Sequence, residues 1–175
     1  MFAPQTPTNT PAGNADSWDG YRMARSRVYD MVDRHHVPNL VVLTGDVHSS
    51  WAFDLPRQLS DTYDPASGRG SLGVEIVCPA VSSPSPFQGD DVPKRLDDLR
   101  ARRPHLKFLD GRSRGYVVMD ITRDRLQADW WFVPTVKARL PEQQFARGLV
   151  CEAGSRHLVE ASAPMPPATG PDPAP

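Results

Sequence analysis

An acid and an imidazole stand directly after an apolar run in "NLVVLTGDVHSSWAFDL", residues 39–55. Asp46 and His48 are two residues apart, so in an extended chain their side chains would point the same way. A carboxylate oxygen suits Ca²⁺, Mg²⁺ or Mn²⁺, and an imidazole nitrogen suits iron or zinc. Two such metal ions held close together would bind a phosphate group between them and activate a water molecule. Asp46 and His48 are therefore candidate metal ligands and candidate catalytic residues.

The pattern Gly-Asp-x-His also fits an ordinary strand end. Asp46 could then cap the next segment, and His48 could be a core histidine whose nitrogens are satisfied. In either case Gly45 would let the backbone turn and approach a ligand closely. Because the pattern fixes only three residues, its spacing leaves both interpretations open. Two ligands also do not complete a catalytic two-metal centre, which needs several more.

Other residues are weaker candidates. Ser49 follows the motif directly and could lie next to a substrate. His105, in "RPHLKFLDG", could approach a substrate or be a surface histidine, which is the more frequent role. His157 lies near the C-terminal tail. Cys78 and Cys151 are far apart, lack metal-ligand spacing and do not predict a disulfide.

The elements that must position the motif indicate a layered α/β fold. Residues 16–37 predict a helix that ends before Pro38, with N-cap candidates in its first turn (Asp16, Ser17 and Asp19). One stripe at helical spacing is expected to be its buried face: Tyr21, Ala24, Val28, Met31, Val32 and His35. The run from Leu40 to Leu43 is apolar without alternation, which is typical of a strand buried on both faces.

Further strands are expected on both sides of a polar insertion. "SSWAFDL" alternates Trp51, Phe53 and Leu55 with more polar residues, and "GVEIVCPAVSS" is another apolar strand. Residues 114–133 predict a β-hairpin with its turn around Arg123 and Asp124. The insertion, residues 83–113, is expected to be a loop, a short charged helix near 92–102, and a second loop.

The composition bounds the class of protein. The chain has 175 residues, the size of one ordinary domain, and a formal net charge of −1. That charge balance gives no field that would attract nucleic acid or an anionic membrane surface. No stretch of about 18 apolar residues is present, so no membrane helix is expected. Residues 1–20 have no basic region followed by an apolar core and so predict no signal peptide.

Three segments are expected along the chain. Residues 1–17, rich in Pro, Thr, Asn and Gly, predict a loop, and residues 18–150 predict the folded domain. Residues 151–175 form a C-terminal segment. Its last sixteen residues, "EASAPMPPATGPDPAP", carry six prolines and little apolar bulk. Such a composition predicts a disordered tail.

Four segments in this order resemble the C-terminal half of PhoD-like alkaline phosphatases, from Trp18 to Val133. They are "WDGYRMARSRVYDMV", "NLVVLTGDVHSSWAFDL", "VEIVCPAVSS" and "PHLKFLDGRSRGYVVMDITRDRLQADWWFV". The resemblance implies a four-layer α/β/β/α metallophosphoesterase sandwich with a mixed sheet and a C-terminal β-hairpin. It implies hydrolysis of phosphate monoesters or diesters with iron and calcium, other divalent metals being an alternative. By this resemblance Asp46 would bind calcium and His48 would bind iron, whereas Ser49 and His105 lie in matching motifs without an assigned role.

The resemblance also implies that part of the site is missing from this chain. In the family, further ligands come from an N-terminal half, and no residue before Trp18 matches them. We therefore expect a fragment that needs its other half, with the family's usual export signal in that missing part. The alternative is a non-catalytic remnant, or an α/β module that binds a metal ion or a partner.

Overall fold

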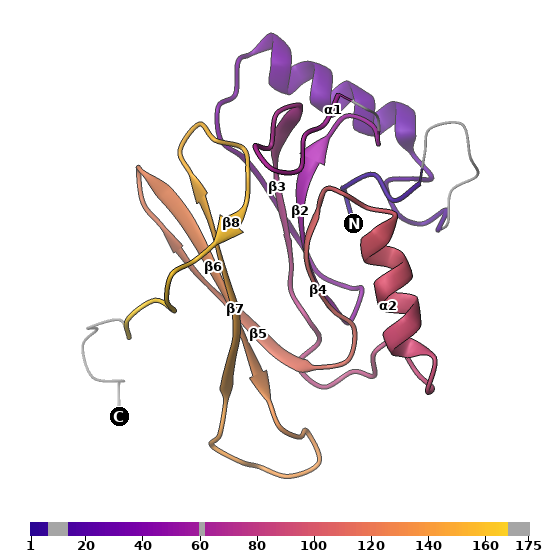
Figure 1. Cartoon of the computed structure of the whole chain (residues 1–175), viewed down its shortest axis with the longest axis vertical. Helices are drawn as coiled ribbons and strands as arrows, with labels where there is room; N and C mark the ends of the chain where they lie inside the picture. The colour runs from indigo at the N-terminus through magenta and orange to yellow at the C-terminus, as the bar shows by residue number, and fades with distance from the viewer. Residues whose placement is uncertain (7–13, 60–61, 168–175) are drawn as a thin grey trace.

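The computed structural model describes residues 1–6, 14–59 and 62–167, which form two helices and two sheets (Figure 1). The helices are α1 (Arg22–Arg34) and α2 (Val92–Ala101). The first sheet contains β1 (Leu40–Thr44), β2 (Ser50–Pro56), β3 (Ser71–Val77) and β4 (Leu106–Asp110). The second contains β5 (Arg114–Ile121), β6 (Arg125–Val133), β7 (Gln144–Glu152) and β8 (Val159–Glu160).

The first sheet is mixed and the second is antiparallel. The strand order in the first sheet is β1-β3-β2-β4, and only the β1–β3 pair is parallel. The second sheet runs β5-β6-β7-β8 in sequence order. The β5–β6 pair confirms the expected hairpin, with Ile121 opposite Leu126 at its turn. The chain is thus a mixed α/β protein, as the sequence predicted.

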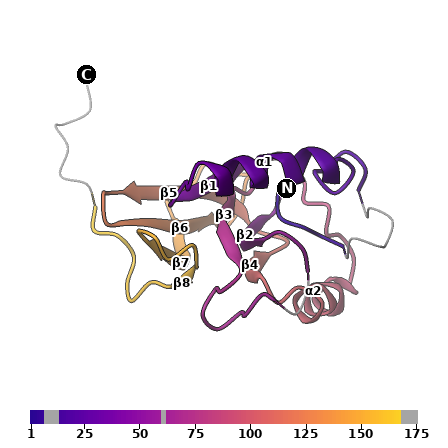
Figure 2. The same ribbon diagram turned by 90° about the horizontal axis from the view of Figure 1, so that it is seen from above.

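The helices and the two sheets form successive layers (Figure 2). Trp51, Phe53 and Leu55 of β2 pack with Tyr29 of α1 in one core cluster, to which both helices contribute. Ala52, on the opposite face of β2, belongs to a second cluster between the sheets. That cluster also contains Val74 and Ile76 of β3, together with Leu126, Ala128, Trp130 and Leu149 of the second sheet. The expected alternation along β2 is therefore confirmed, with both of its faces buried.

The first helix is shorter than predicted, and most of the expected stripe is not its buried face. Its buried residues are Arg25, Tyr29 and Val32. Of the predicted stripe, Tyr21 is 61% exposed and Met31 is 50% exposed. None of the predicted N-cap side chains caps the helix. Asp19 is instead buried, where it binds the guanidinium of Arg25 and the backbone of the N-terminal segment.

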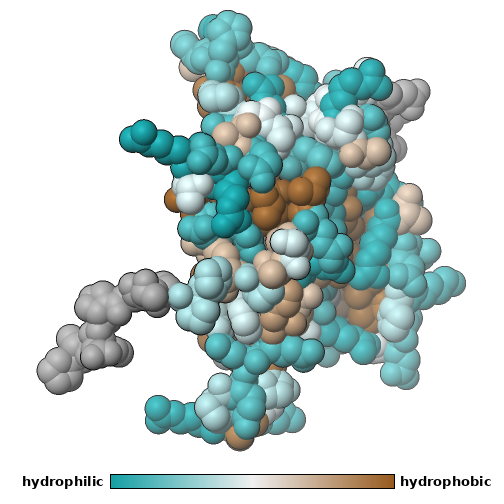
Figure 3. All heavy atoms as spheres, turned by 60° about the vertical axis from the view of Figure 1, so that its left-hand side comes forward, coloured by the Kyte–Doolittle hydropathy of each residue, from teal (hydrophilic) through white to brown (hydrophobic). Residues whose placement is uncertain are grey.

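Strand β1 is an edge strand rather than a strand buried on both faces. Its only hydrogen-bonded neighbour among the described strands is β3, and Leu43 is 61% exposed. The expectation failed because a continuous apolar run does not say whether both faces are covered within the same chain. Figure 3 shows apolar residues gathered in the middle of one face of the molecule, within a mostly hydrophilic surface.

Three strands were not predicted. The helix in the insertion is confirmed as α2, but the second loop of the insertion is in fact β4, which pairs with β2 along the edge of the first sheet. Strands β7 and β8 extend the hairpin to a four-stranded sheet. Neither described helix has the length and apolar character of a membrane span.

Both termini are anchored to the sheets in the described residues. Phe2 and Ala3 are buried, and their amides donate to the carboxylate of Glu75 on β3. At the other end, the amide of Met165 donates to Asp129 on β6 at 2.7 Å. The stretch from 160 to 167 is therefore held against the second sheet, contrary to the expected disorder. Residues 7–13 of the predicted N-terminal loop and 168–175 of the predicted tail lie outside the described residues.

Candidate functional site

The Gly-Asp-Val-His motif forms a tight turn between β1 and β2, not an extended chain. Asp46 has a φ of +70° and His48 a φ of +55°, the left-handed region that non-glycine residues rarely adopt. The amide of Val47 donates to the carbonyl of Gly45 at 2.9 Å. This three-residue γ-turn with a positive central φ is the rarer, strained form. Such strain clusters at binding and catalytic sites, where surrounding structure maintains it.

Gly45 is not required by the turn itself. Its φ is not among the positive values, and a Cβ added to it would meet no described atom within 4 Å. The expectation that Gly45 lets the chain turn is therefore wrong. Gly45 is exposed, with open space beside it among the described residues.

The ring of His48 is oriented by a backbone carbonyl. Its Nδ1 lies 3.1 Å from the carbonyl oxygen of Pro84, in the turn after β3. Because a carbonyl can only accept, Nδ1 carries the hydrogen and donates it. In the neutral imidazole this leaves Nε2 with a free lone pair. Metal-binding histidines are commonly held by this kind of second hydrogen bond.

The carboxylate of Asp46 is free and faces a cavity. It is exposed and makes no hydrogen bond or ion pair with any residue that the structure describes. The cavity has a volume of about 610 Å³ and lies between the N-terminal segment, the motif turn and α2. That size lies within the usual range of small-molecule sites, roughly 300–1,000 Å³.

The two candidate ligands fit a metal site that this part of the chain does not complete. Across residues 1–6, 14–59 and 62–167, no three His, Cys, Asp or Glu side chains form a group that could hold a metal ion. A free carboxylate and an oriented imidazole with an available nitrogen are nevertheless suitable donors. Additional ligands would have to come from elsewhere.

The serine after the motif supports the turn. Ser49 is fully buried, and its hydroxyl donates to the carbonyl of Val47 at 3.2 Å. The same hydroxyl accepts a hydrogen bond from the indole of Trp51 at 2.8 Å. Ser49 is therefore bonded to the turn and to β2, with its side chain shielded from solvent.

His105 lies in the core and away from the motif. It is fully buried rather than on the surface, and its ring stacks on Phe53 with centroids 5.3 Å apart. Phe53 pairs with Leu106 near the start of β4, whereas Ser50, beside the motif, pairs with Asp110 at the other end. Neither ring nitrogen of His105 has a hydrogen-bond partner among the described residues. The structure does not bring His105 to Asp46 and His48.

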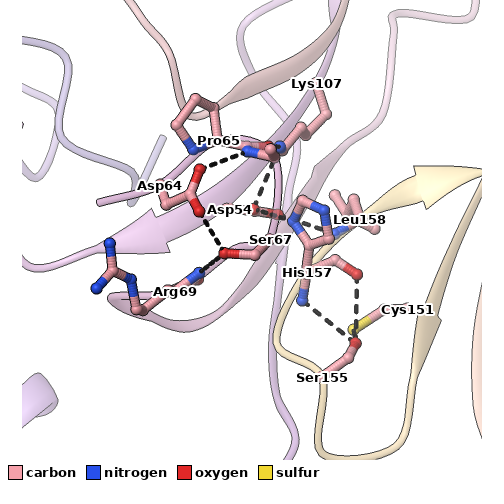
Figure 4. A network of polar contacts seen from close by, with 12 residues as sticks. Asp54, Asp64, Pro65, Ser67, Arg69, Lys107, Cys151, Ser155, His157 and Leu158 are labelled. Carbon is pink, nitrogen blue, oxygen red and sulfur yellow. Dashed lines mark hydrogen bonds and ion pairs between the residues drawn. The ribbon is translucent and has the colours of Figure 1, made fainter. Parts of the chain in front are cut away.

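A second polar cluster ties the two sheets together (Figure 4). The buried carboxylate of Asp54 accepts hydrogen bonds from Tyr63 at 2.8 Å and from the amide of Leu158 at 2.9 Å. Nδ1 of His157 lies 2.7 Å from the same carboxylate, and Nζ of Lys107 lies 3.5 Å away. This Asp54 cluster contains His157, which the sequence placed only near a tail. The cluster lies between the sheets and joins β2 to the segment before β8.

Several residues beside the motif were not found from the sequence. Three arginines, Arg95, Arg102 and Arg103, line the cavity that Asp46 faces, as does Gln5 of the N-terminal segment. The sequence showed Arg95 and Arg102 only as part of a short charged helix, with Arg103 directly after it. Their proximity to Asp46 depends on how α2 packs beside β4, and no local pattern indicates that.

Known proteins resemble this chain in sequence and structure. The family model described as "PhoD-like phosphatase" matches residues 1–130. The chain is 34% identical over 127 residues to "Alkaline phosphatase D" of Bacillus subtilis (strain 168), covering 73% of the chain and 20% of that relative. A solved "Structure of PhoD" matches 94% of the chain and 30% of its own, with a TM-score of 0.72 and 28% identity. The chain thus spans less than a third of the length of these two proteins.

Proposed function

The chain belongs to the PhoD-like phosphatase family, and we propose from this premise that it supplies one part of a metal-dependent site that hydrolyses phosphate monoesters or diesters. The observation that carries the proposal is the strained turn at Asp46 and His48. One candidate ligand there is free and the other is oriented for binding.

Asp46 and His48 are the proposed metal ligands of this chain. By family resemblance Asp46 would hold calcium and His48 would hold iron. The bound metals would supply an activated water and stabilise negative charge on the phosphoryl oxygens. The carbonyl of Pro84 keeps Nδ1 of His48 protonated, so that Nε2 is the nitrogen offered to the metal. The hydroxyl of Ser49 holds the backbone of the turn that carries both ligands.

The remaining ligands are proposed to come from another part of the whole family protein. The same part would complete a four-layer α/β/β/α sandwich around the layers described above. The free edge of β1 and the exposed apolar residues nearby are its proposed contact surface. These exposed residues include Tyr21 just before α1, Met23 and Met31 on α1, and Leu43 on β1. Exposed apolar strand edges in soluble proteins are normally covered or protected.

A chimera tests this function. This chain replaces the matched segment of the Bacillus subtilis relative, and hydrolysis of p-nitrophenyl phosphate and bis-p-nitrophenyl phosphate is measured at alkaline pH with iron and calcium. We expect turnover that chelator removes and that Asp46→Ala or His48→Ala lowers by at least about a hundredfold, as for loss of a group central to catalysis. A matched control is Asp97→Ala, an exposed aspartate on α2.

An active chimera whose turnover survives both ligand substitutions would contradict the assignment of Asp46 and His48. The chain by itself, supplied with the same metals, is expected to hydrolyse little substrate. The described residues offer only two good metal ligands, and a catalytic two-metal centre needs several more. Robust turnover by the chain alone that disappears in His48→Ala would refute the need for another part. A chain that binds metal without turnover, even in the chimera, would be a non-catalytic remnant or a metal-binding module.

A further inference from the structure

Three arginines line the cavity beside Asp46, and two of them lie outside ion-pair distance of any described carboxylate. Arg102 and Arg103, directly after α2, line it, and neither guanidinium lies within 4.0 Å of a described carboxylate. Arg95, on α2, approaches Asp91 only to 3.9 Å and lies over the ring of Phe87 at 5.4 Å. Arg102 and Arg103 therefore border the cavity without a described counter-ion in ion-pair distance, and Arg95 has only the 3.9 Å contact with Asp91.

Two polar atoms in the same cavity wall are buried without a partner among the residues described. One is a donor, Nε of Arg103, and the other is an acceptor, Oε1 of Gln5. Buried polar groups are nearly always paired, so these two residues retain unused hydrogen-bonding capacity beside the cavity. Burial, followed by the charge of Arg102, lowers the pKa of Arg103. This is the direction expected for a cation without an adjacent anion.

The acids that line the cavity form no ion pairs with these arginines. Asp16, Asp46 and Asp98 also border it, but none lies within ion-pair distance of the three arginines. Asp46 is the proposed metal ligand, so a bound cation would offset its charge. The wall also contains aromatic surface from Phe87 and Trp51. The cavity therefore combines guanidinium donors with an apolar wall, next to the motif turn.

We propose that this cavity is an anion subsite, in which Arg102 and Arg103 bind a second charged group of a phosphate ester. This subsite proposal rests on the function proposed above for Asp46, and it adds a substrate class to that function. The substrates would carry a further phosphate or carboxylate beyond the phosphorus that is attacked. Guanidinium groups match such oxyanions because their planar donors can bind two oxygens at once.

The subsite is tested by titrating the purified chain with pyrophosphate in the presence of chelator, using calorimetry at low salt. We expect saturable binding that Arg103→Gln weakens by about tenfold or more, the loss of one charge-assisted hydrogen bond. Arg102→Gln should weaken it as well, and its more exposed position keeps the fold intact. Arg69→Gln, an exposed arginine in the loop before β3, is the matched control and should bind as the wild type does.

The readout does not depend on turnover. Asp46→Asn should bind pyrophosphate at least as tightly as the wild type, since a negative charge leaves the cavity rim. If that pattern holds while the chimera shows no metal-dependent hydrolysis, the subsite stands and the proposed function fails. Absence of pyrophosphate binding by folded wild-type chain, or wild-type affinity in both Arg103→Gln and Arg102→Gln, would overturn the subsite whatever the chimera does.

Discussion

At the scale of single residues, His105 couples the stability of the core to pH. Burial, followed by the charge of Arg103, lowers the pKa of His105 to about 3. The folded protein therefore holds the ring neutral, whereas the unfolded chain protonates near an ordinary pKa of about 6.5. Unfolding takes up a proton below that pH, so stability is complete above it and falls as the pH drops toward 3. The slope is about 1.4 kcal/mol per pH unit.

Replacing His105 by leucine should remove this dependence. Urea unfolding at pH 7 and pH 5 is expected to show that the wild type loses about 2 kcal/mol more than His105→Leu over that interval. His35→Leu, at the exposed end of α1, should keep the wild-type slope. Equal pH dependence in the wild type and His105→Leu would show that another buried group carries the effect.

The chemistry of the motif could be predicted from residue types, but its geometry could not. Asp46 and His48 stand out as an acid and an imidazole after an apolar run. Their left-handed backbone, by contrast, is uncommon for any residue with a side chain, and no local pattern in the sequence indicates it. The carbonyl of Pro84 that orients His48 is 36 residues away along the chain. No local pattern could have paired them.

At the scale of elements, Glu75 fastens the N-terminal segment to the first sheet. Its buried carboxylate accepts from the amides of Phe2 at 2.7 Å and Ala3 at 2.8 Å, one on each oxygen. The hydroxyl of Thr44 on β1 donates to it at 2.5 Å. The segment held in this way brings Gln5 to the cavity beside Asp46. A carboxylate in the middle of β3 thus positions part of the candidate site.

Glu75→Gln should loosen this segment. The amide of glutamine presents an N–H group to one of the two backbone donors, so one hydrogen bond becomes a repulsion between donors. We expect a loss of about 2–3 kcal/mol in the free energy of unfolding and faster hydrogen exchange at Phe2 and Ala3. Glu142→Gln, at an exposed position, should change neither quantity. Unchanged exchange at Phe2 and Ala3 would rule out this anchoring role.

Elements with a strong pattern of their own were predictable, and elements defined by their partners were not. The alternation in β2 and in the β5–β6 hairpin reflects faces that the chain itself buries. Strand β4 has a short, mixed sequence after a charged helix, and it is a strand because β2 offers it an edge. The outer face of α1 was misjudged because its apolar residues have no cover within the described chain.

At the scale of the whole molecule, the free edge of β1 predicts self-association. Leu43 is exposed on a strand that has one neighbour among the described strands, and α1 carries further exposed apolar residues. The chain alone should form dimers or larger species as its concentration rises, and Leu43→Lys should reduce this because lysine protects strand edges. Sedimentation velocity across a concentration series measures the change.

Val118→Lys is the matched control for that experiment, since Val118 is an exposed apolar residue on the second sheet. It should leave the self-association largely as it is in the wild type. If the chain stays monomeric at high concentration, or if both lysine variants behave alike, the edge of β1 is not the contact surface.

The Asp54 cluster limits how early the two sheets can close while the chain is being synthesised. Synthesis delivers Asp54 and Tyr63 early, but the imidazole and the amide that complete its bonding follow 103 and 104 residues later. Until then the first sheet would have to bury a carboxylate whose charge is only partly matched, which is unfavourable. A nascent chain should therefore keep β2 open, or hold Asp54 in water, until residues 157 and 158 have left the ribosome. Closure of the two sheets would then be among the last events, and a chain released before that point should be a preferred substrate for proteases.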